Sequence, residues 1–69
     1  MKAQVCYDDR PITIRIFKGR NSQMIAELPL NEPNDKKADA SLRAIKMRRI
    51  EKWQDTSWGK EARVRFVFA

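Results

Sequence analysis

The chain has no histidine, only two glycines and a single cysteine among its 69 residues. Without histidine, the side chain most often used for general acid-base catalysis is missing, so hydrolytic triads and histidine-bearing metal sites are excluded. Two isolated glycines cannot form the glycine-rich loops that hold nucleotide phosphates. The sequence therefore predicts a protein that is not an enzyme, with no catalytic residue, cofactor, metal or small-molecule substrate.

The single cysteine, Cys6, cannot form an intramolecular disulfide, and no cluster of cysteine and histidine is present to hold zinc. A chain this short buries only about 60% of the surface that its unfolded form exposes, so its core must be thin. Because both usual stabilising devices of small folds are absent, a homodimer is a reasonable hypothesis. We interpret Cys6 as a small buried side chain.

Long apolar runs are also absent. No stretch of 18 apolar residues occurs, and residues 1–11 lack the apolar run of a signal peptide. The sequence therefore predicts a cytoplasmic protein. A membrane partner is not expected, because no segment combines basic charge with the large, clean apolar face that membrane-surface helices carry.

Basic charge is what the chain has in excess, and it is confined to one half. Residues 1–35 carry five Lys/Arg and five acids, whereas residues 36–69 carry ten Lys/Arg and four acids, so the second half holds the whole net charge of +6. Charge distributed in this way attracts nucleic-acid phosphates or acidic protein surfaces.

The first 28 residues predict three strands, over about residues 3–7, 11–18 and 22–28. Ile12, Ile14 and Ile16 alternate with more polar side chains, a period of two that is typical of a half-buried strand. Gly19 and Asn21 both tolerate positive φ, which favours a hairpin turn between the second and third strands. Met24, Ala26 and Leu28 would then share one face of the third strand, although an amphipathic helix remains an alternative for this segment.

The second half predicts a loop over residues 29–35, a helix over about 36–53, a turn over 54–60 and a strand over 61–68. Two prolines favour the loop, and Asn34 or Asp35 can cap the helix, which contains no glycine or proline. The order β-β-β-α-β predicts a single α+β domain, a small mainly antiparallel sheet with one basic α-helix packed on one face. The expected core comprises Ile12, Ile14, Ile16, Leu42, Ile45, Ile50, Trp53, Val64, Phe66 and Phe68.

The expected helix is irregular. Its apolar side chains span an arc of about 140°, but Lys46 and Arg49 project within that arc while Met47 falls outside it. Basic side chains that lay their methylenes over the edge of the core would explain this pattern. A helix with two working faces, the second around Arg43, Met47 and Arg48, would explain it equally.

Arginine and aromatic side chains supply the candidate binding site. Guanidinium groups bind phosphate oxygens bidentately, and exposed aromatic rings stack on bases or anchor protein interfaces. The leading hypothesis is a nucleic-acid-binding accessory or regulatory protein that contacts phosphates through its helix and last strand. The alternative is a small inhibitor or adaptor, of the kind mobile elements encode, that binds an acidic surface of a larger host protein; the charge run could also be a solvated face. The candidate residues are Phe17, Arg43, Lys46, Met47, Arg48, Arg49, Lys52, Trp58, Arg63 and Arg65.

Overall fold

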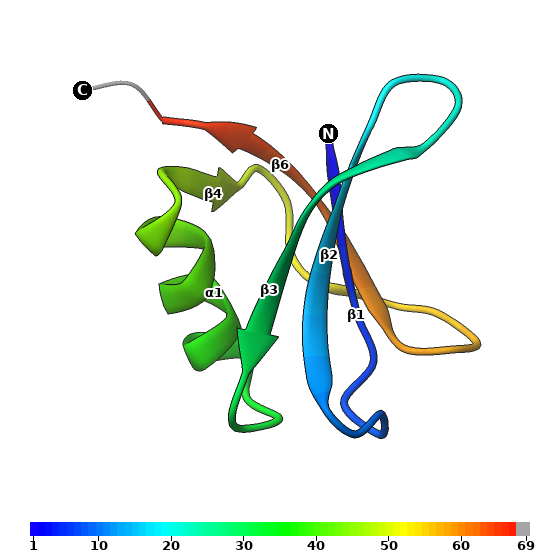
Figure 1. Cartoon of the computed structure of the whole chain (residues 1–69), viewed down its shortest axis with the longest axis vertical. Helices are drawn as coiled ribbons and strands as arrows, with labels where there is room; N and C mark the ends of the chain where they lie inside the picture. Colours follow the sequence, from blue (N-terminus) through cyan, green and yellow to red (C-terminus); the bar gives the residue numbers. More distant parts are fainter. Residues whose placement is uncertain (68–69) are drawn as a thin grey trace.

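The computed structural model describes residues 1–67, and it contains one helix and six strands within that range (Figure 1). Phe68, which the sequence pattern assigned to the core, lies outside the described residues. The elements are β1 (Lys2–Val5), β2 (Ile12–Lys18), β3 (Gln23–Leu30), α1 (Asp35–Ala44), β4 (Met47–Arg49), β5 (Gln54–Asp55) and β6 (Lys60–Phe66).

All strand pairings are antiparallel, and the strands lie side by side in the order β3-β2-β1-β6-β4, with β5 also pairing to β6. The strand nearest the N-terminus is therefore central, flanked by β2 and by the last strand. Helix α1 lies on one side of this sheet and contacts β3 and β4 (Figure 1). The expected fold class, a small antiparallel α+β fold with one helix, is confirmed.

The core lies between the helix and the inner face of the sheet. Its largest fully buried side chains come from five different elements, and burying each one contributes about 1.5 to 3 kcal/mol. They are Val5, Ile14, Ile16, Leu42, Met47 and Val64. The alternation predicted for β2 is confirmed, because Ile12, Ile14 and Ile16 are buried while Arg15 between them is exposed.

The helix is shorter than expected, and the predicted extension to residue 53 is wrong. Asn34 caps it as predicted, with its side chain accepting hydrogen bonds from the backbone N–H groups of Lys36 and Lys37. The helix stops at Ala44, and Lys46 adopts a φ of 64°. This left-handed conformation costs a non-glycine residue about 1 kcal/mol, yet it turns the chain so that β4 can pair with β6.

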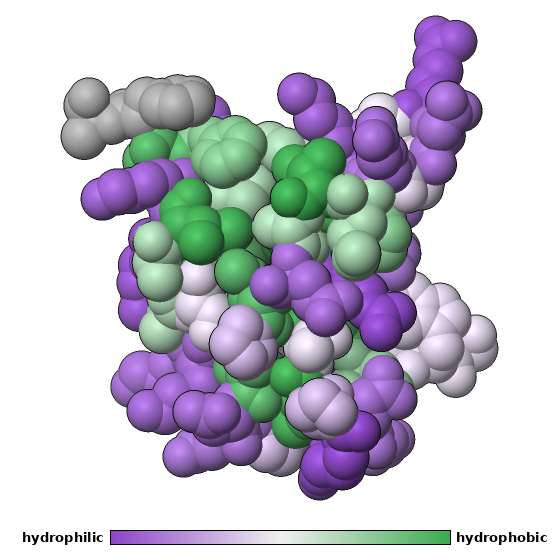
Figure 2. All heavy atoms as spheres, in the orientation of Figure 1, coloured by the Kyte–Doolittle hydropathy of each residue, from purple (hydrophilic) through white to green (hydrophobic). Residues whose placement is uncertain are grey.

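The early stop of the helix changes the core. Ile50 is 49% exposed and Phe66 is 39% exposed, so neither is the core residue that the sequence pattern predicted, while Ile45 and Trp53 pack against the core only partly. Ile50 follows β4 instead of lying on a helix. Phe66 pairs with Met47 at the C-terminal end of β6. Figure 2 shows apolar side chains gathered in the upper half of this face, between the helix and the β2–β3 hairpin.

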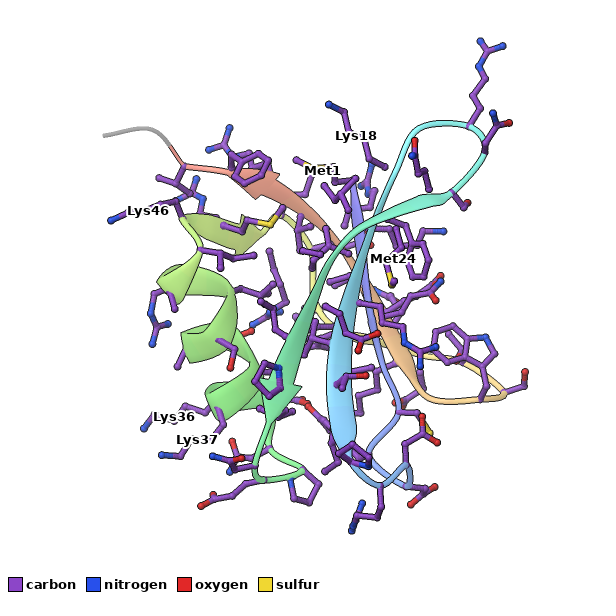
Figure 3. The ribbon with its side chains drawn as sticks, in the orientation of Figure 1. Met1, Lys18, Met24, Lys36, Lys37 and Lys46 are labelled. Atoms are coloured by element: carbon purple, nitrogen blue, oxygen red, sulfur yellow. The ribbon has the colours of Figure 1, made fainter. Side chains whose placement is uncertain are left out.

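A bulge changes the face on which Met24 lies. The register of β2 with β3 shifts between Ile16 and Phe17, so that Ile16 pairs with Ala26 but Phe17 pairs with Met24. Met24 therefore lies on the face of Phe17, away from the helix, and not on the face of Ala26 and Leu28 as expected (Figure 3). A bulge inserts one residue into one strand, and a shift of one residue moves a side chain to the opposite face.

Within residues 1–67, no helix has both the length and the apolar character needed to span a membrane.

Candidate nucleic-acid interface

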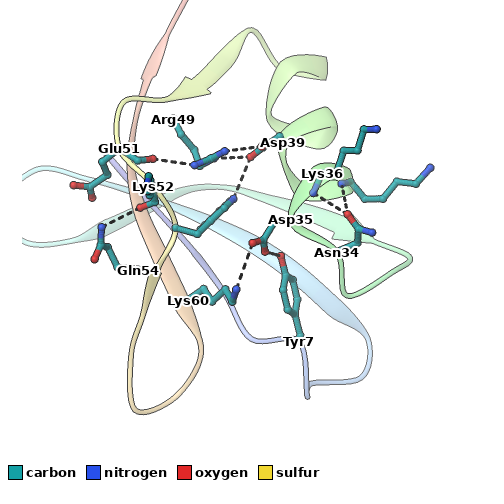
Figure 4. A network of polar contacts seen from close by, with 12 residues as sticks. Tyr7, Asn34, Asp35, Lys36, Asp39, Arg49, Glu51, Lys52, Gln54 and Lys60 are labelled. Carbon is teal, nitrogen blue, oxygen red and sulfur yellow. Dashed lines mark hydrogen bonds and ion pairs between the residues drawn. The ribbon is translucent and has the colours of Figure 1, made fainter.

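Strand β4 places its two arginines on opposite sides, and Arg49 points toward the helix. Its guanidinium donates two hydrogen bonds to the carboxylate of Asp39, at 2.6 and 2.7 Å, and a third to the carbonyl oxygen of Glu51 at 3.1 Å (Figure 4). Trp53 donates its indole N–H to the same carboxylate, and the Arg49 guanidinium lies 5.6 Å from the centre of the Trp53 ring. Arg49 is therefore a structural residue, with three of its five N–H donors engaged within the protein.

The ionisation of this cluster follows from its hydrogen bonds. The bonds from Arg49 lower the pKa of Asp39 below its usual value, and the same bonds raise the pKa of the Arg49 guanidinium. Each charge stabilises the ionised form of the other, which keeps the pair charged at neutral pH. The pair ties α1 to the segment that follows it.

Arg48 points the other way and meets Arg65. The two arginines occupy directly opposite positions of the antiparallel β4–β6 pair, and both are exposed. Within residues 1–67, neither has an acidic side chain within ion-pair distance. Like charges at directly opposed positions destabilise a sheet. Two opposed, uncompensated arginines therefore form a site that an anion would stabilise.

An open hollow of about 540 Å³ lies beside Arg48, between the helix and the residues that follow β4. The hollow is lined by two acids, and each already forms an ion pair. Asp39 pairs with Arg49, and Glu51 pairs with Arg63. Apart from Arg49, the cations that line the hollow have no acidic side chain within ion-pair distance in the described part of the chain. The cations around the hollow are Arg43, Arg48, Arg49 and Lys52, all of which the sequence pattern had selected.

The other basic residues on this side lie at the ends of the helix. Lys46 follows the C-terminus of α1, while Lys36 and Lys37 lie in the first turn, and Figure 3 shows all three pointing away from the sheet. The prediction that the basic residues share one helix is wrong beyond Ala44, because Arg48 belongs to β4 and Lys52 to the following segment. The sheet edge, not a helix face, brings them together.

Met47 is not available to a partner, which corrects its selection as a contact residue. It is only 1% exposed, because β4 turns it inward against the core. The sequence-based interpretation placed Met47 on an outer helix face, and that face does not exist.

The last strand alternates as expected. Arg63 and Arg65 are exposed, while Ala62 and Val64 between and beside them are buried. Arg63 is partly occupied, since both its backbone N–H and its Nε donate to the Glu51 carboxylate, at 2.8 and 3.2 Å. These bonds, first of all the one from the Arg63 backbone, lower the pKa of Glu51.

Phe17 and Trp58 both lie on the outer face of the sheet, away from the helix. Phe17 is directly opposite Lys2, which is in turn directly opposite Arg63. Trp58, 45% exposed, lies beside Arg15 across a shallow hollow. Sequence reasoning missed Lys2, because it belongs to the half of the chain with no net charge, and only the central position of β1 brings it to Arg63.

A second polar network fixes the other end of the helix. The Tyr7 hydroxyl donates to the Asp35 carboxylate at 2.5 Å, and Lys60 approaches the other oxygen of that carboxylate at 3.3 Å (Figure 4). Burial, together with the bond to Asp35, raises the pKa of Tyr7. This network joins the end of β1 and the start of β6 to the first turn of α1.

Comparisons with protein-family models, with curated proteins and with solved structures gave no match for this chain.

Proposed function

We propose that this protein binds nucleic acid without acting as an enzyme, as an accessory or regulatory protein, and that it holds phosphates at the edge formed by β4 and β6. The observation that carries the proposal is the opposed pair Arg48 and Arg65, two exposed arginines with no acidic partner in residues 1–67.

Phosphate is the anion that this arrangement favours. An arginine presents parallel N–H donors to two oxygens of a phosphate group, and a charged acceptor makes such bonds about twice as strong as neutral ones. Antiparallel neighbours lie about 5 Å apart, so two guanidinium groups can reach one phosphate or two successive ones. Arg43 and Lys52 add positive charge beside the hollow next to Arg48.

The test is fluorescence-anisotropy binding to labelled duplex DNA, single-stranded DNA and RNA at two salt concentrations. About five neutralised phosphates would make the affinity fall roughly 10² to 10³-fold for a fourfold rise in salt. Arg48→Ala/Arg65→Ala should weaken binding at least tenfold and lower the salt slope by about two.

Lys36→Ala/Lys37→Ala is the matched control, because it also removes two positive charges, but from the first turn of the helix, and alanine preserves helix propensity. Thermal unfolding by circular dichroism would verify that both variants fold. The proposal fails if wild-type protein binds none of the three nucleic acids at low salt, or if the control loses as much affinity as the arginine variant.

A protein partner with an acidic surface is the second candidate function, and Ile50 favours it. This side chain is 49% exposed and lies in sequence between Arg48 and Lys52, and phosphate offers no contact for an exposed isoleucine. Protein interfaces combine arginine with apolar side chains. A pull-down from nuclease-treated lysate distinguishes the two functions: a protein captured by wild type and lost with Ile50→Ser supports the adaptor, whereas loss of all capture after nuclease supports nucleic acid.

A further inference from the structure

The outer face of the sheet carries a row of side chains that crosses three strands. Phe17 of β2 is directly opposite Lys2 of β1, and Lys2 is directly opposite Arg63 of β6. These three residues and Gln4 line an open hollow of about 250 Å³. An aromatic ring and two cations therefore face the same small depression.

A second hollow lies next to the first on the same face. It has a volume of about 300 Å³, and Trp58 lines it together with Gln4, Thr13 and Arg15. Gln4 lines both hollows, so they are neighbours. Thr13 and Phe17 are four residues apart in β2, so the two hollows extend over about 13 Å of strand. The face thus offers two aromatic rings in succession with a polar side chain between them.

The backbone of the turn that carries Trp58 is held by hydrogen bonds and close packing, while the indole is 45% exposed. The Thr56 hydroxyl accepts hydrogen bonds from the backbone N–H groups of Trp58 and Gly59, and the Thr56 N–H donates to the Gly59 carbonyl oxygen at 2.7 Å. Gly59 packs so closely on the end of β1 that an added Cβ would collide with the Val5 carbonyl oxygen. A backbone fixed in this way presents the Trp58 ring, with nearly half its surface in water, at a defined position on the outer face.

The outer face carries a net positive charge, which favours an anionic ligand. It, its two hollows and its β4 edge carry five cations and four acids, a net charge of +1, and the cations continue from the row of Phe17 toward Arg48. The cations are Lys2, Arg15, Arg48, Arg63 and Arg65, and the acids are Asp9, Glu27, Glu51 and Glu61. Lys2, Arg15 and Arg63 form ion pairs with Glu61, Glu27 and Glu51 respectively, so the excess positive charge lies at Arg48 and Arg65. Basic side chains that alternate with aromatic rings on an open surface are typical of sites for single-stranded nucleic acid, whose unpaired bases have free faces for stacking. The bases of a duplex are already stacked on one another.

We infer that the ligand is a single-stranded nucleic acid, whose bases stack on Phe17 and Trp58 while its phosphates follow Lys2, Arg63, Arg65 and Arg48. This inference rests on the proposed function, since it names the strand form and the residues that hold the bases. The same chemistry serves single-stranded DNA and RNA, so the experiment includes both.

The experiment measures binding of labelled 15-nucleotide oligo(dT), oligo(U) and a 15-base-pair duplex by fluorescence anisotropy. Wild type should bind at least one single strand at least tenfold more tightly than the duplex. Trp58→Ala should weaken that binding about 5- to 100-fold. Trp58→Phe should retain most of it, because a smaller ring still stacks.

Ile50→Ala is the matched control, because it also removes an exposed apolar side chain but lies away from the two hollows. A second readout uses Trp53→Phe, which leaves Trp58 as the one tryptophan of the chain. Single strands should quench the fluorescence of Trp58 in this variant, and the duplex should not.

The outcomes separate this inference from the proposed function. If duplex and single strands bind equally and only Arg48→Ala/Arg65→Ala weakens binding, the function stands and the inference is overturned. If no nucleic acid binds a folded protein at low salt, both fail. If oligo(U) alone shows the dependence on Trp58, the ligand is RNA, and if oligo(dT) alone does so, it is single-stranded DNA.

Discussion

The helix side of the sheet and the edge formed by β4 and β6 use their cations in opposite ways. On the helix side, Arg49 and Lys60 each bind an acid of α1, Asp39 and Asp35 respectively. At the β4–β6 edge, Arg48 and Arg65 face each other, and neither has an acidic side chain within ion-pair distance among residues 1–67. A cation bound by an acid holds the fold together, whereas a cation left opposite another is available to an anion. Adjacent residues of the same type, Arg48 and Arg49, thus have different roles.

The largest expected effect is a loss of stability on removal of the Asp39 carboxylate, and its absence would contradict this comparison. Asp39→Ala removes the acceptor of two Arg49 bonds and of the Trp53 indole, and we expect the free energy of unfolding to fall by about 2 to 3 kcal/mol. Urea unfolding followed by circular dichroism measures this loss.

Arg48→Ala is the control on the other side of the same strand. It should change the free energy of unfolding by less than about 0.5 kcal/mol, because within residues 1–67 it removes a repulsion and no ion pair. An equal loss in the two variants would contradict the division of roles between Arg48 and Arg49.

The next largest expected effect is a loss of stability at acid pH, which acts on the Arg49–Asp39 pair of the helix side. Because Arg49 lowers the pKa of Asp39 in the folded state, the pair contributes stability above the unfolded value of about 3.8 and loses it as the pH falls through the lower, folded value. The free energy of unfolding should therefore decline as the pH falls below about 5, and the decline should be larger in wild type than in Asp39→Asn.

Glu27→Gln serves as the acid control. Its partner Arg15 is exposed and the two lie 3.5 Å apart, so the pair contributes little. This variant should keep the pH dependence of wild type. The assignment to Asp39 is wrong if the Asp39→Asn curve follows the wild-type curve instead.

The smallest expected effect is the change in stability on substitution of Lys46, which tests whether the helix ends before this residue. Because Lys46 has a φ of 64°, Lys46→Gly should raise the free energy of unfolding by up to about 1 kcal/mol. If the helix continued through this position, glycine would instead lower it by about 1 kcal/mol. Thermal unfolding shows whether the variant is more or less stable than wild type. Lys37→Gly, inside the helix, is the control and should destabilise.

Local patterns predicted β1, β2, β3, β6 and the start of the helix, but they did not predict β4 and β5, which lie where a helix and a turn were expected. Ile12, Ile14 and Ile16 repeat every two residues and form the buried side of β2, and Asn34 caps the helix through its own side chain. Both features depend on side chains that are close in sequence, so the pattern carries the information.

The end of the helix could not be predicted in the same way. No glycine or proline marks Ala44, and residues 45–53 have good helix propensity. Pairing of Met47 with Phe66 and burial of Met47 against the core outweigh that propensity. The irregular helical arc, with Lys46 and Arg49 inside it and Met47 outside it, was the one available sign.

The sequence by itself determined the amphipathic strands, the capped start of the helix, the lack of histidine and of a glycine-rich phosphate loop, and the confinement of net charge to the second half. Only the tertiary structure decided which cations are neutralised and which meet across strands. Lys2 and Arg63 are 61 positions apart in the chain but directly opposite in the sheet. The physical reason is that strand order and register are set by pairing between distant segments, which no local pattern of side chains records.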